Sequence, residues 1–340
     1  NKHFLLQEAK KGIYQMSTLK DVAKECGLSV TTVSRALNNR GYISKEAHEK
    51  IQAAMKKLNY QPNEIARSLS KQSSNSIGVI MPYIDQPFFS RLLNYLEVEA
   101  DKRGYVLYVF CSKAYDAKEE EYLEICKRHR VAGIILCTDA VNIDKFADVS
   151  VPIISLEREI SYAAESIVCD NKTGGKIVAE YLYGQGCRNF LYLNPGHWTG
   201  MQCDDRGISF RKQGESMGVQ VKEYSASWEE HKCLNYHKTI REVLEKNPDA
   251  DAIFCNGDAL ALQTIQTCYK MGIDIPGKIR IVGYDDAQLA ELSCPPLTTV
   301  HQPIKEMAEK AIESLDRLCN GKKIASKVLL PVTLVVRETA

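Results

Sequence analysis

The chain has 340 residues, of which 44% are hydrophobic and 26% charged, a composition that fits a globular protein of two or three compact units. Its formal net charge of +1 hides an asymmetry, because residues 1–75 hold 13 Lys and Arg against 6 Asp and Glu, whereas the rest holds 31 against 37. A basic head on an acidic body indicates that only the head meets a polyanion. No run of 18 or more apolar residues occurs, so we expect no membrane span and no membrane partner.

The twelve cysteines are scattered along the chain, and no Cys-x-x-Cys pair occurs among them. We therefore expect reduced, mostly buried thiols in a cytoplasmic protein, and neither a metal site nor a disulfide framework. None of the seven histidines belongs to a His-Glu-x-x-His motif, and the sequence has no Gly-x-Ser-x-Gly elbow and no phosphate-binding loop. The sequence thus predicts no cofactor, no metal and no catalytic residue.

A small all-helical domain is expected over residues 16–61, after an extension or added expression segment at 1–15 that lacks the apolar core of a signal peptide. Apolar residues recur at helical spacing in Leu19–Cys26, and Gly27 ends that helix. Ser29 is a good N-cap for a second helix that runs to about Leu37. Ser44 then caps a third helix, Lys45–Leu58.

Two short helices joined by a tight link follow the helix-turn-helix plan, in which the second helix enters the DNA major groove. Val33 and Leu37 share one face of the second helix and are expected to pack inward. The outward positions are Val30, Thr31, Ser34 and Arg35. Arg can bond guanine with two hydrogen bonds, and Thr or Ser can meet a base edge or a phosphate. A plain three-helix bundle is the alternative, which the charge asymmetry disfavours.

Residues 62–76 are expected to form a hinge. Pro62 ends the preceding element, Asn63 can cap a short helix over Glu64–Ser70, and the polar run Lys71–Ser76 is typical of a linker.

From residue 77 to 340, short apolar runs alternate with amphipathic segments, which predicts parallel sheets built from right-handed βαβ units. The expected strands are Ile77–Met81, Tyr105–Phe110, Gly133–Cys137, Ile153–Leu156, Phe190–Leu193, Val219–Tyr224, Ala252–Cys255 and Ile279–Val282. The expected helices include Phe89–Arg103, Ala117–His129, Lys172–Gly184, Trp228–Lys246, Ala259–Met271 and Pro303–Asn320. So many strands are too many for one sheet, so the fold class predicted is α/β with two doubly wound subdomains behind an all-α head.

Polar groups stand where several of these strands end, and such positions line the cleft between α/β subdomains. The candidate ligand-binding residues are Phe88, Phe89, Asp170, Arg206, Trp228, Asn256, Asp258 and Asp285. Arg and Asp can grip vicinal hydroxyls, while an aromatic face covers the apolar side of a sugar ring. Each residue also has a structural alternative: Asp258 as a helix N-cap, Trp228 as core, Arg206 as a surface charge. We expect Arg206 and Asp285 to face one another from opposite subdomains, because they fall in different βα segments.

The segments Leu19–Ala23 and Gly27–Asn38 resemble the DNA-binding head of the lactose/galactose repressor family, and so does Leu58–Leu69. Val282–Asp286 and Pro296–Val300 resemble the family's core signatures, in the expected order from about Thr18 to Arg337. The resemblance implies DNA contacts at Thr18, Leu19, Ser29, Val30, Thr31, Ser34, Arg35, Asn38, Ala66 and Leu69. It also implies that the hinge helix lies in the minor groove, with Leu69 as a wedge that kinks the duplex.

The resemblance further implies a homodimer or higher oligomer on a pseudo-palindromic operator in double-stranded DNA, regulated by a small-molecule effector. A sugar or sugar phosphate is the first expectation for that effector, and a purine corepressor is the alternative. One departure concerns Gly257, which stands where many relatives place Asn directly before the Asp that opens the helix. Two other classes remain as alternatives. A free sugar-binding protein of the periplasmic type needs a signal sequence and has no use for residues 19–69, and an enzyme on an α/β frame is disfavoured because the catalytic motifs named above are missing.

Overall fold

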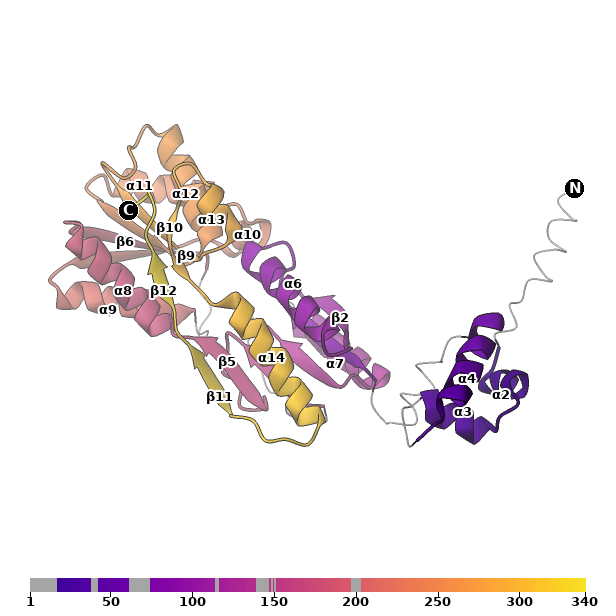
Figure 1. The fold of residues 1–340 in the computed structure, drawn as a ribbon. Helices are drawn as coiled ribbons and strands as arrows, with labels where there is room; N and C mark the ends of the chain where they lie inside the picture. The colour runs from indigo at the N-terminus through magenta and orange to yellow at the C-terminus, as the bar shows by residue number, and fades with distance from the viewer. Residues whose placement is uncertain are drawn as a thin grey trace, which may run out of the picture. The chain divides into compact units, whose positions relative to one another are not determined.

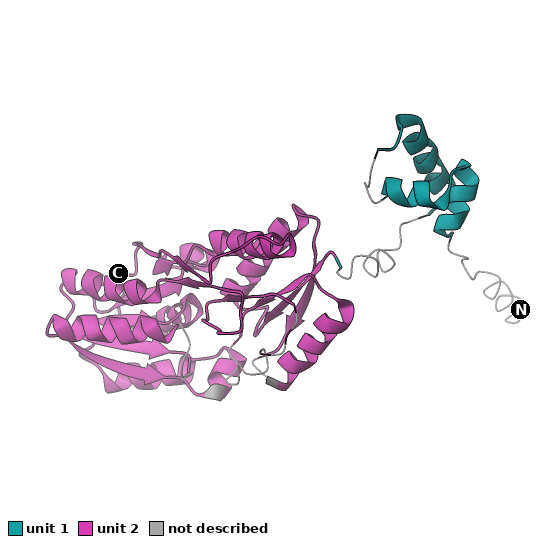
Figure 2. Ribbon diagram, turned by 90° about the horizontal axis from the view of Figure 1, so that it is seen from below, with its two compact units in different colours: residues 1–74 teal, residues 75–340 magenta. Residues whose placement is uncertain are grey.

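The computed structural model describes residues 17–37, 42–60, 74–113, 116–138, 147, 149, 151–196 and 203–340. It divides into two compact units, Asn1–Ser74 and Asn75–Ala340 (Figure 2). The expected extension at 1–15 and the expected hinge helix lie outside the described residues. Within the described part of the chain, no helix has the length and apolar character needed to cross a bilayer.

The head consists of α2 (Leu19–Cys26), α3 (Val30–Leu37) and α4 (Lys45–Lys57). Gly27 ends α2 with a φ of 68°, a left-handed conformation that glycine adopts without steric cost. The head core is formed by Val22 and Ala23 of α2, Val33 and Ala36 of α3, and Ile51 and Ala54 of α4. The predicted helix positions and the inward face of the second helix are thus confirmed.

The first subdomain of the larger unit contains a parallel sheet in the order β11-β5-β4-β3-β1-β2. Its strands are β1 (Ser76–Met81), β2 (Val106–Cys111), β3 (Gly133–Leu136), β4 (Ile153–Leu156), β5 (Glu165–Cys169) and β11 (Lys327–Leu330). Helices α6 (Pro87–Asp101) and α14 (Ile304–Cys319) cover one face, and α7 (Asp116–His129) covers the other (Figure 1). Side chains alternate accordingly in β1, where Val79 packs toward α6 and α14 while Ile80 packs toward α7.

The second subdomain contains a sheet in the order β12-β10-β9-β8-β6-β7, parallel except for the β10–β12 pair. Its strands are β6 (Asn189–Asn194), β7 (Gln220–Ser225), β8 (Ala252–Cys255), β9 (Arg280–Asp285), β10 (Thr298–His301) and β12 (Thr333–Val335). Its helices are α8 (Asn171–Gly184), α9 (Asp204–Ser216), α10 (Trp228–Cys233), α11 (His237–Lys246), α12 (Asp258–Lys270) and α13 (Gln288–Leu292). Two doubly wound subdomains, as predicted, are therefore present.

The single helix expected over Trp228–Lys246 is instead two helices. Leu234 ends α10 with a φ of 50°, and its backbone N–H bonds back to the carbonyl groups of Glu230 and His231. A left-handed residue interrupts the α-helical ladder, so α11 begins anew at His237.

The chain passes between the two subdomains three times: between β5 and α8, between β10 and α14, and between β11 and β12. Each subdomain is therefore assembled from segments that lie far apart in the sequence. Gln302, in the crossing between β10 and α14, lines the cleft between the subdomains.

Helices α8 and α9 lie side by side and approach at glycine positions (Figure 1). A Cβ atom at Gly175 would lie 2.0 Å from the carbonyl oxygen of Arg206. A Cβ at Gly174 would lie 2.3 Å from the hydroxyl of Tyr284. Because any side chain at Gly175 would collide with backbone, this close approach fixes where α9 presents Arg206.

Candidate functional site

The exposed face of α3 is the candidate DNA interface. Val33 and Ala36 are buried in the head core, which turns Val30, Thr31 and Arg35 outward, with Val30 41% exposed. Ser34 is half-buried. An exposed guanidinium beside small side chains can reach base edges in a groove or a phosphate.

Other head residues expected at DNA have structural roles in the described region. The Ser29 hydroxyl accepts a hydrogen bond from the Thr32 backbone N–H (3.0 Å) and so caps α3. The Thr18 hydroxyl donates to Asp21 (2.6 Å), and hydrogen bonds from the Thr18 side chain and backbone lower the pKa of the Asp21 carboxyl. Leu19 packs against the head core. The expected contacts Asn38, Ala66 and Leu69 lie outside the described residues.

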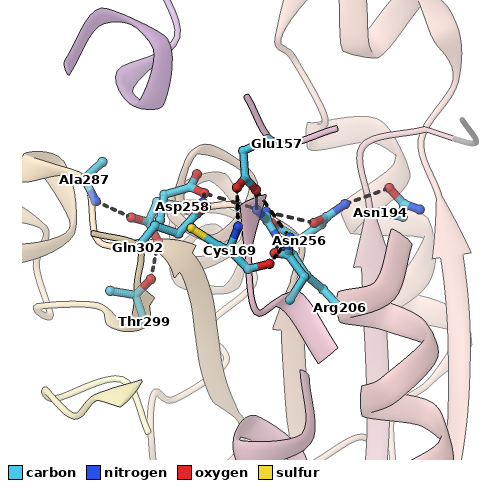
Figure 3. A network of polar contacts seen from close by, with 11 residues as sticks. Glu157, Cys169, Asn194, Arg206, Asn256, Asp258, Ala287, Thr299 and Gln302 are labelled. Carbon is cyan, nitrogen blue, oxygen red and sulfur yellow. Dashed lines mark hydrogen bonds and ion pairs between the residues drawn. The ribbon is translucent and has the colours of Figure 1, made fainter. Parts of the chain in front are cut away.

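The second candidate site is the cleft between the two subdomains, with Arg206 of α9 near its centre. Arg206 is 6% exposed, and its guanidinium stacks on the ring of Tyr284 with the guanidinium carbon 3.7 Å from the ring centroid. Its Nε donates to Asn171 Oδ1 (2.7 Å), and its Nη1 donates to the carbonyl of Asn256 (2.8 Å). Figure 3 shows this network, in which Asn256 also donates to Asn194 Oδ1 (3.2 Å).

Carboxylates approach Arg206 from both subdomains. Glu157 follows β4 of the first subdomain, and its Oε2 lies 3.6 Å from Arg206 Nη2. Its other oxygen accepts a hydrogen bond from the Cys169 backbone N–H (2.7 Å). Asp285 ends β9 of the second subdomain, with its Oδ1 3.7 Å from Arg206 Nη1. The guanidinium is therefore shared between the two halves of the core.

Burial raises the pKa of two carboxyl groups in the cleft. Desolvation raises the pKa of Asp285 to about 6, despite the opposing effects of Arg206 and of the hydrogen bond that Gln302 Nε2 donates (2.6 Å). Desolvation also raises the pKa of Asp258, whose carboxylate accepts hydrogen bonds from Thr299 Oγ1 (2.5 Å) and the Ala287 N–H (2.7 Å). Asp258 thus holds the β9–α13 turn in place.

The opposite wall of the cleft is largely aromatic. Phe88 and Phe89 of α6 pack edge to face with ring centroids 5.2 Å apart, and both line the cleft. His231 also lines the cleft; its Nδ1 lies 3.1 Å from the Tyr236 hydroxyl, and burial lowers the pKa of His231 to about 4. The imidazole of His231 is therefore neutral at physiological pH. The cleft combines an apolar wall with a charged one, which suits a small ligand with a polar edge and an apolar face.

Two further contacts bridge the subdomains. The Tyr83 ring, after β1, lies edge-on to His231 with centroids 5.5 Å apart. In the second contact, Arg91 Nη1 of α6 donates to the carbonyl of Asp286 (2.9 Å), which follows β9. Both contacts change if one subdomain turns relative to the other.

The predicted cleft residues Phe88, Phe89, Arg206, Asn256, Asp258 and Asp285 all line the cleft. Asp170 does not; its carboxylate accepts hydrogen bonds from the Thr173 N–H (3.0 Å) and hydroxyl (2.7 Å) and caps α8, because the first free N–H groups of that helix need an acceptor. Trp228 begins α10, and its side chain lies outside the described residues.

The expectation that Arg206 and Asp285 lie on opposite subdomains is wrong. Both belong to the second subdomain, since α9 packs on β6 and β7 and Asp285 ends β9 of the same sheet. The residue that faces Arg206 from the first subdomain is Glu157. Glu157 and Gln302 were missed. Glu157 directly follows the apolar strand β4, a signal that could have placed it at a strand end, whereas Gln302 follows β10, whose sequence Thr-Thr-Val-His is not an apolar run.

Comparison with known proteins agrees with this architecture. Residues 18–63 match the bacterial regulatory proteins of the lacI family, and residues 179–340 match a periplasmic binding protein-like domain. The chain is 34% identical over 325 residues to a ribose operon repressor of Halalkalibacterium halodurans, a match that covers 95% of this chain and 97% of the relative. It is likewise 34% identical over 325 residues to a sucrose operon repressor of Streptococcus mutans, covering 95% and 99%.

Among solved structures, a periplasmic binding protein/LacI transcriptional regulator from Alkaliphilus metalliredigens complexed with D-xylulofuranose has a TM-score of 0.70 and 28% identity. That match covers 78% of this chain and 99% of the other. A helix-turn-helix head joined to a two-subdomain core with a polar cleft defines a DNA-binding transcription regulator controlled by a small ligand. The chain belongs to the LacI family of bacterial regulatory proteins.

Proposed function

We propose that this protein is a dimeric repressor in which each head reads one half of a pseudo-palindromic operator, while a sugar bound in the cleft changes operator affinity. The observation that carries the proposal is the Arg206 cluster, in which Glu157 and Asp285 approach one guanidinium from the two subdomains. A ligand that replaces part of this network contacts both subdomains. It therefore favours one of their relative orientations by its differential affinity for the two states.

A second copy of the chain is the partner that the proposal requires. One recognition helix reads only a few base pairs, so specific binding needs two heads. The core offers a surface for pairing: β2 is an edge strand of its sheet, and Val106, Tyr108 and Val109 on it are 64%, 41% and 42% exposed. Apolar side chains grouped on an unpaired sheet edge favour association.

The cleft supports binding without chemical turnover. Its carboxylates already have structural roles: those of Glu157 and Asp285 pair with Arg206, and that of Asp258 holds the β9–α13 turn. We therefore infer that the protein is a regulator and not an enzyme, and that it acts on DNA in the cytoplasm.

The proposal is tested by selecting DNA sequences from a random duplex pool with the full-length protein and measuring gel retardation of the enriched sequences. We expect enriched sequences with two inverted half-sites, and sedimentation of two protein chains per duplex. Ribose, sucrose and xylulose are then added, and at least one is expected to change operator affinity. Enrichment of unpaired half-sites bound by a monomer would contradict the dimer. A response to hypoxanthine alone would favour the purine alternative.

A further inference from the structure

The charges around the cleft point to the chemical class of its ligand. We propose that the cleft takes an uncharged polyol and discriminates against sugars that carry a phosphate or a carboxylate. This inference rests on the proposed function, because it concerns the ligand of the same cleft. The sequence predicts a sugar or a sugar phosphate, and this inference selects the sugar without a phosphate.

Negative groups outnumber positive groups in the lining. Among the described residues that line the cleft, Arg206 is the one side chain that is positively charged at neutral pH, and no lysine is present. Three carboxyl groups line the same space; because burial raises the pKa of Asp258, the negative charge that opposes an anion comes from Glu157 and Asp285. His231 adds no positive charge, because burial lowers its pKa to about 4. An anion entering the cleft would therefore meet a net negative field.

The positive charge of Arg206 is already engaged by the protein. Its Nε and Nη1 donate to Asn171 and Asn256, and its two Nη atoms lie 3.6 and 3.7 Å from carboxylates. Any phosphate within hydrogen-bonding distance of this guanidinium would lie beside those carboxylates. A phosphate carries about −1.5 to −2 charge at pH 7, so it would have to displace both acids. A hydroxyl oxygen, which has no net charge, can instead accept from Nη2 while the ion pairs remain.

Two neutral amides supply the other polar contacts. Gln302 is 1% exposed; its Nε2 donates to Asp285, and its Oε1 has no hydrogen-bond partner among the described residues. Gln86, the N-cap residue of α6, has a buried Nε2 that likewise has no partner within the described part of the chain. One vacant acceptor and one vacant donor, both uncharged, suit hydroxyl groups, which donate and accept. A buried polar atom without a partner costs stability, so a polyol that satisfies both gains affinity.

The size and the apolar wall of the cleft agree with a small sugar. The free volume is about 180 Å³, below the roughly 300–1,000 Å³ of pockets for drug-sized ligands. Phe88, Phe89 and Tyr236 offer aromatic surface for the apolar face of a sugar ring.

The test compares matched pairs of ligands with the full-length protein at pH 7.5 and constant ionic strength. The pairs are ribose with ribose 5-phosphate, sucrose with sucrose 6-phosphate, and xylulose with xylulose 5-phosphate. Thermal unfolding identifies the pairs that bind, and calorimetry then measures Kd. We expect at least one neutral sugar to bind, and to bind at least tenfold more tightly than its phosphate.

A phosphorylated member that binds as tightly as its neutral partner would overturn the inference, yet the proposed function would stand if that compound changed operator affinity. Binding of hypoxanthine and of none of the sugars would also overturn the polyol class. Loss of the proposed function itself would appear differently, as operator affinity that no bound compound changes.

Substitutions of Gln86 test whether uncharged polar groups in the cleft set the preference for a neutral ligand. Gln86→Leu keeps the volume but removes the vacant donor, and we expect about a five- to tenfold weaker Kd for the neutral sugar. Gln185→Leu is the matched control, since Gln185 is an exposed residue after α8, and its Kd should equal that of the wild type. Gln86→Lys supplies a cation at the cleft, and the phosphate should gain at least tenfold relative to the neutral sugar. An unchanged preference in Gln86→Lys, or an unchanged Kd in Gln86→Leu, would overturn the argument.

Discussion

Replacing Gly175 by alanine tests whether the position of Arg206 depends on the close approach of α8 and α9. A Cβ at position 175 would lie 2.0 Å from the Arg206 carbonyl oxygen and 2.4 Å from Ser209 Oγ. The serine hydroxyl can rotate away, but the carbonyl belongs to the backbone of α9. That helix must therefore move by roughly 1 Å to restore ordinary contact.

The magnitude follows from two opposing effects. Overpacking of a close-packed contact costs about 1–3 kcal/mol, whereas alanine in place of glycine inside a helix contributes up to about 1 kcal/mol. We expect a net destabilisation of about 1–2 kcal/mol, which lowers the Tm of a unit of this size by about 2–8 °C. Ligand affinity should fall as well, because the displaced backbone carries Arg206.

The matched control is Gly184→Ala in the same helix. Gly184 is the last residue of α8, and a Cβ there would meet no atom within 4 Å. This variant should be as stable as the wild type or more stable by up to about 1 kcal/mol. Thermal unfolding followed by circular dichroism measures all three proteins. A Tm for Gly175→Ala at or above that of Gly184→Ala would refute the packing argument.

Three further predictions concern DNA and pH. Arg35→Ala should weaken operator binding by about 1–3 kcal/mol and relax the preference at one base position; a uniform loss over all sequences in a binding-site selection would make Arg35 a phosphate contact. Leu69→Ala, outside the described residues, should reduce the DNA bend, and an unchanged bend in a circular-permutation gel shift would rule out the wedge. Asp285 has a folded-state pKa of about 6 because burial raises it, above the roughly 3.9 of an unfolded chain. Its contribution to stability is therefore present below about pH 4 and lost as the pH rises through 6. The Tm of the wild type should fall relative to Asp285→Asn between pH 5 and 7, and a constant difference would contradict this.

Local patterns in the sequence predicted most elements, and long-range assembly explains what they missed. Short apolar runs placed β4 and β8 at their observed bounds, because all four residues of each strand are buried in the core. The assignment of Arg206 and Asp285 to opposite subdomains failed, since a strand end does not reveal which sheet the strand joins. That information resides in the crossings between subdomains, which are set by tertiary packing.

Part of the candidate site was predictable from the residue types and their places in the sequence, whereas the rest depends on partners that only the fold brings together. Phe88 and Arg206 line the cleft as expected. Asp170 also directly follows a strand, yet its carboxylate caps α8 by accepting a hydrogen bond from the Thr173 N–H. Gln302 carries no motif, and its role depends on Asp285, 17 residues away in sequence. Such pairings are visible only in the folded chain.

The three crossings between the subdomains also govern the order in which a newly synthesised chain can fold. The head core is complete once residues up to α4 have left the ribosome, whereas the first subdomain needs α14 and β11, and the second needs β12. At about 5–20 residues per second, the head precedes the core by roughly 15–55 s. A chain that ends anywhere from residue 61 to residue 303 would keep a head able to fold, but it could complete neither half of the core that controls that head.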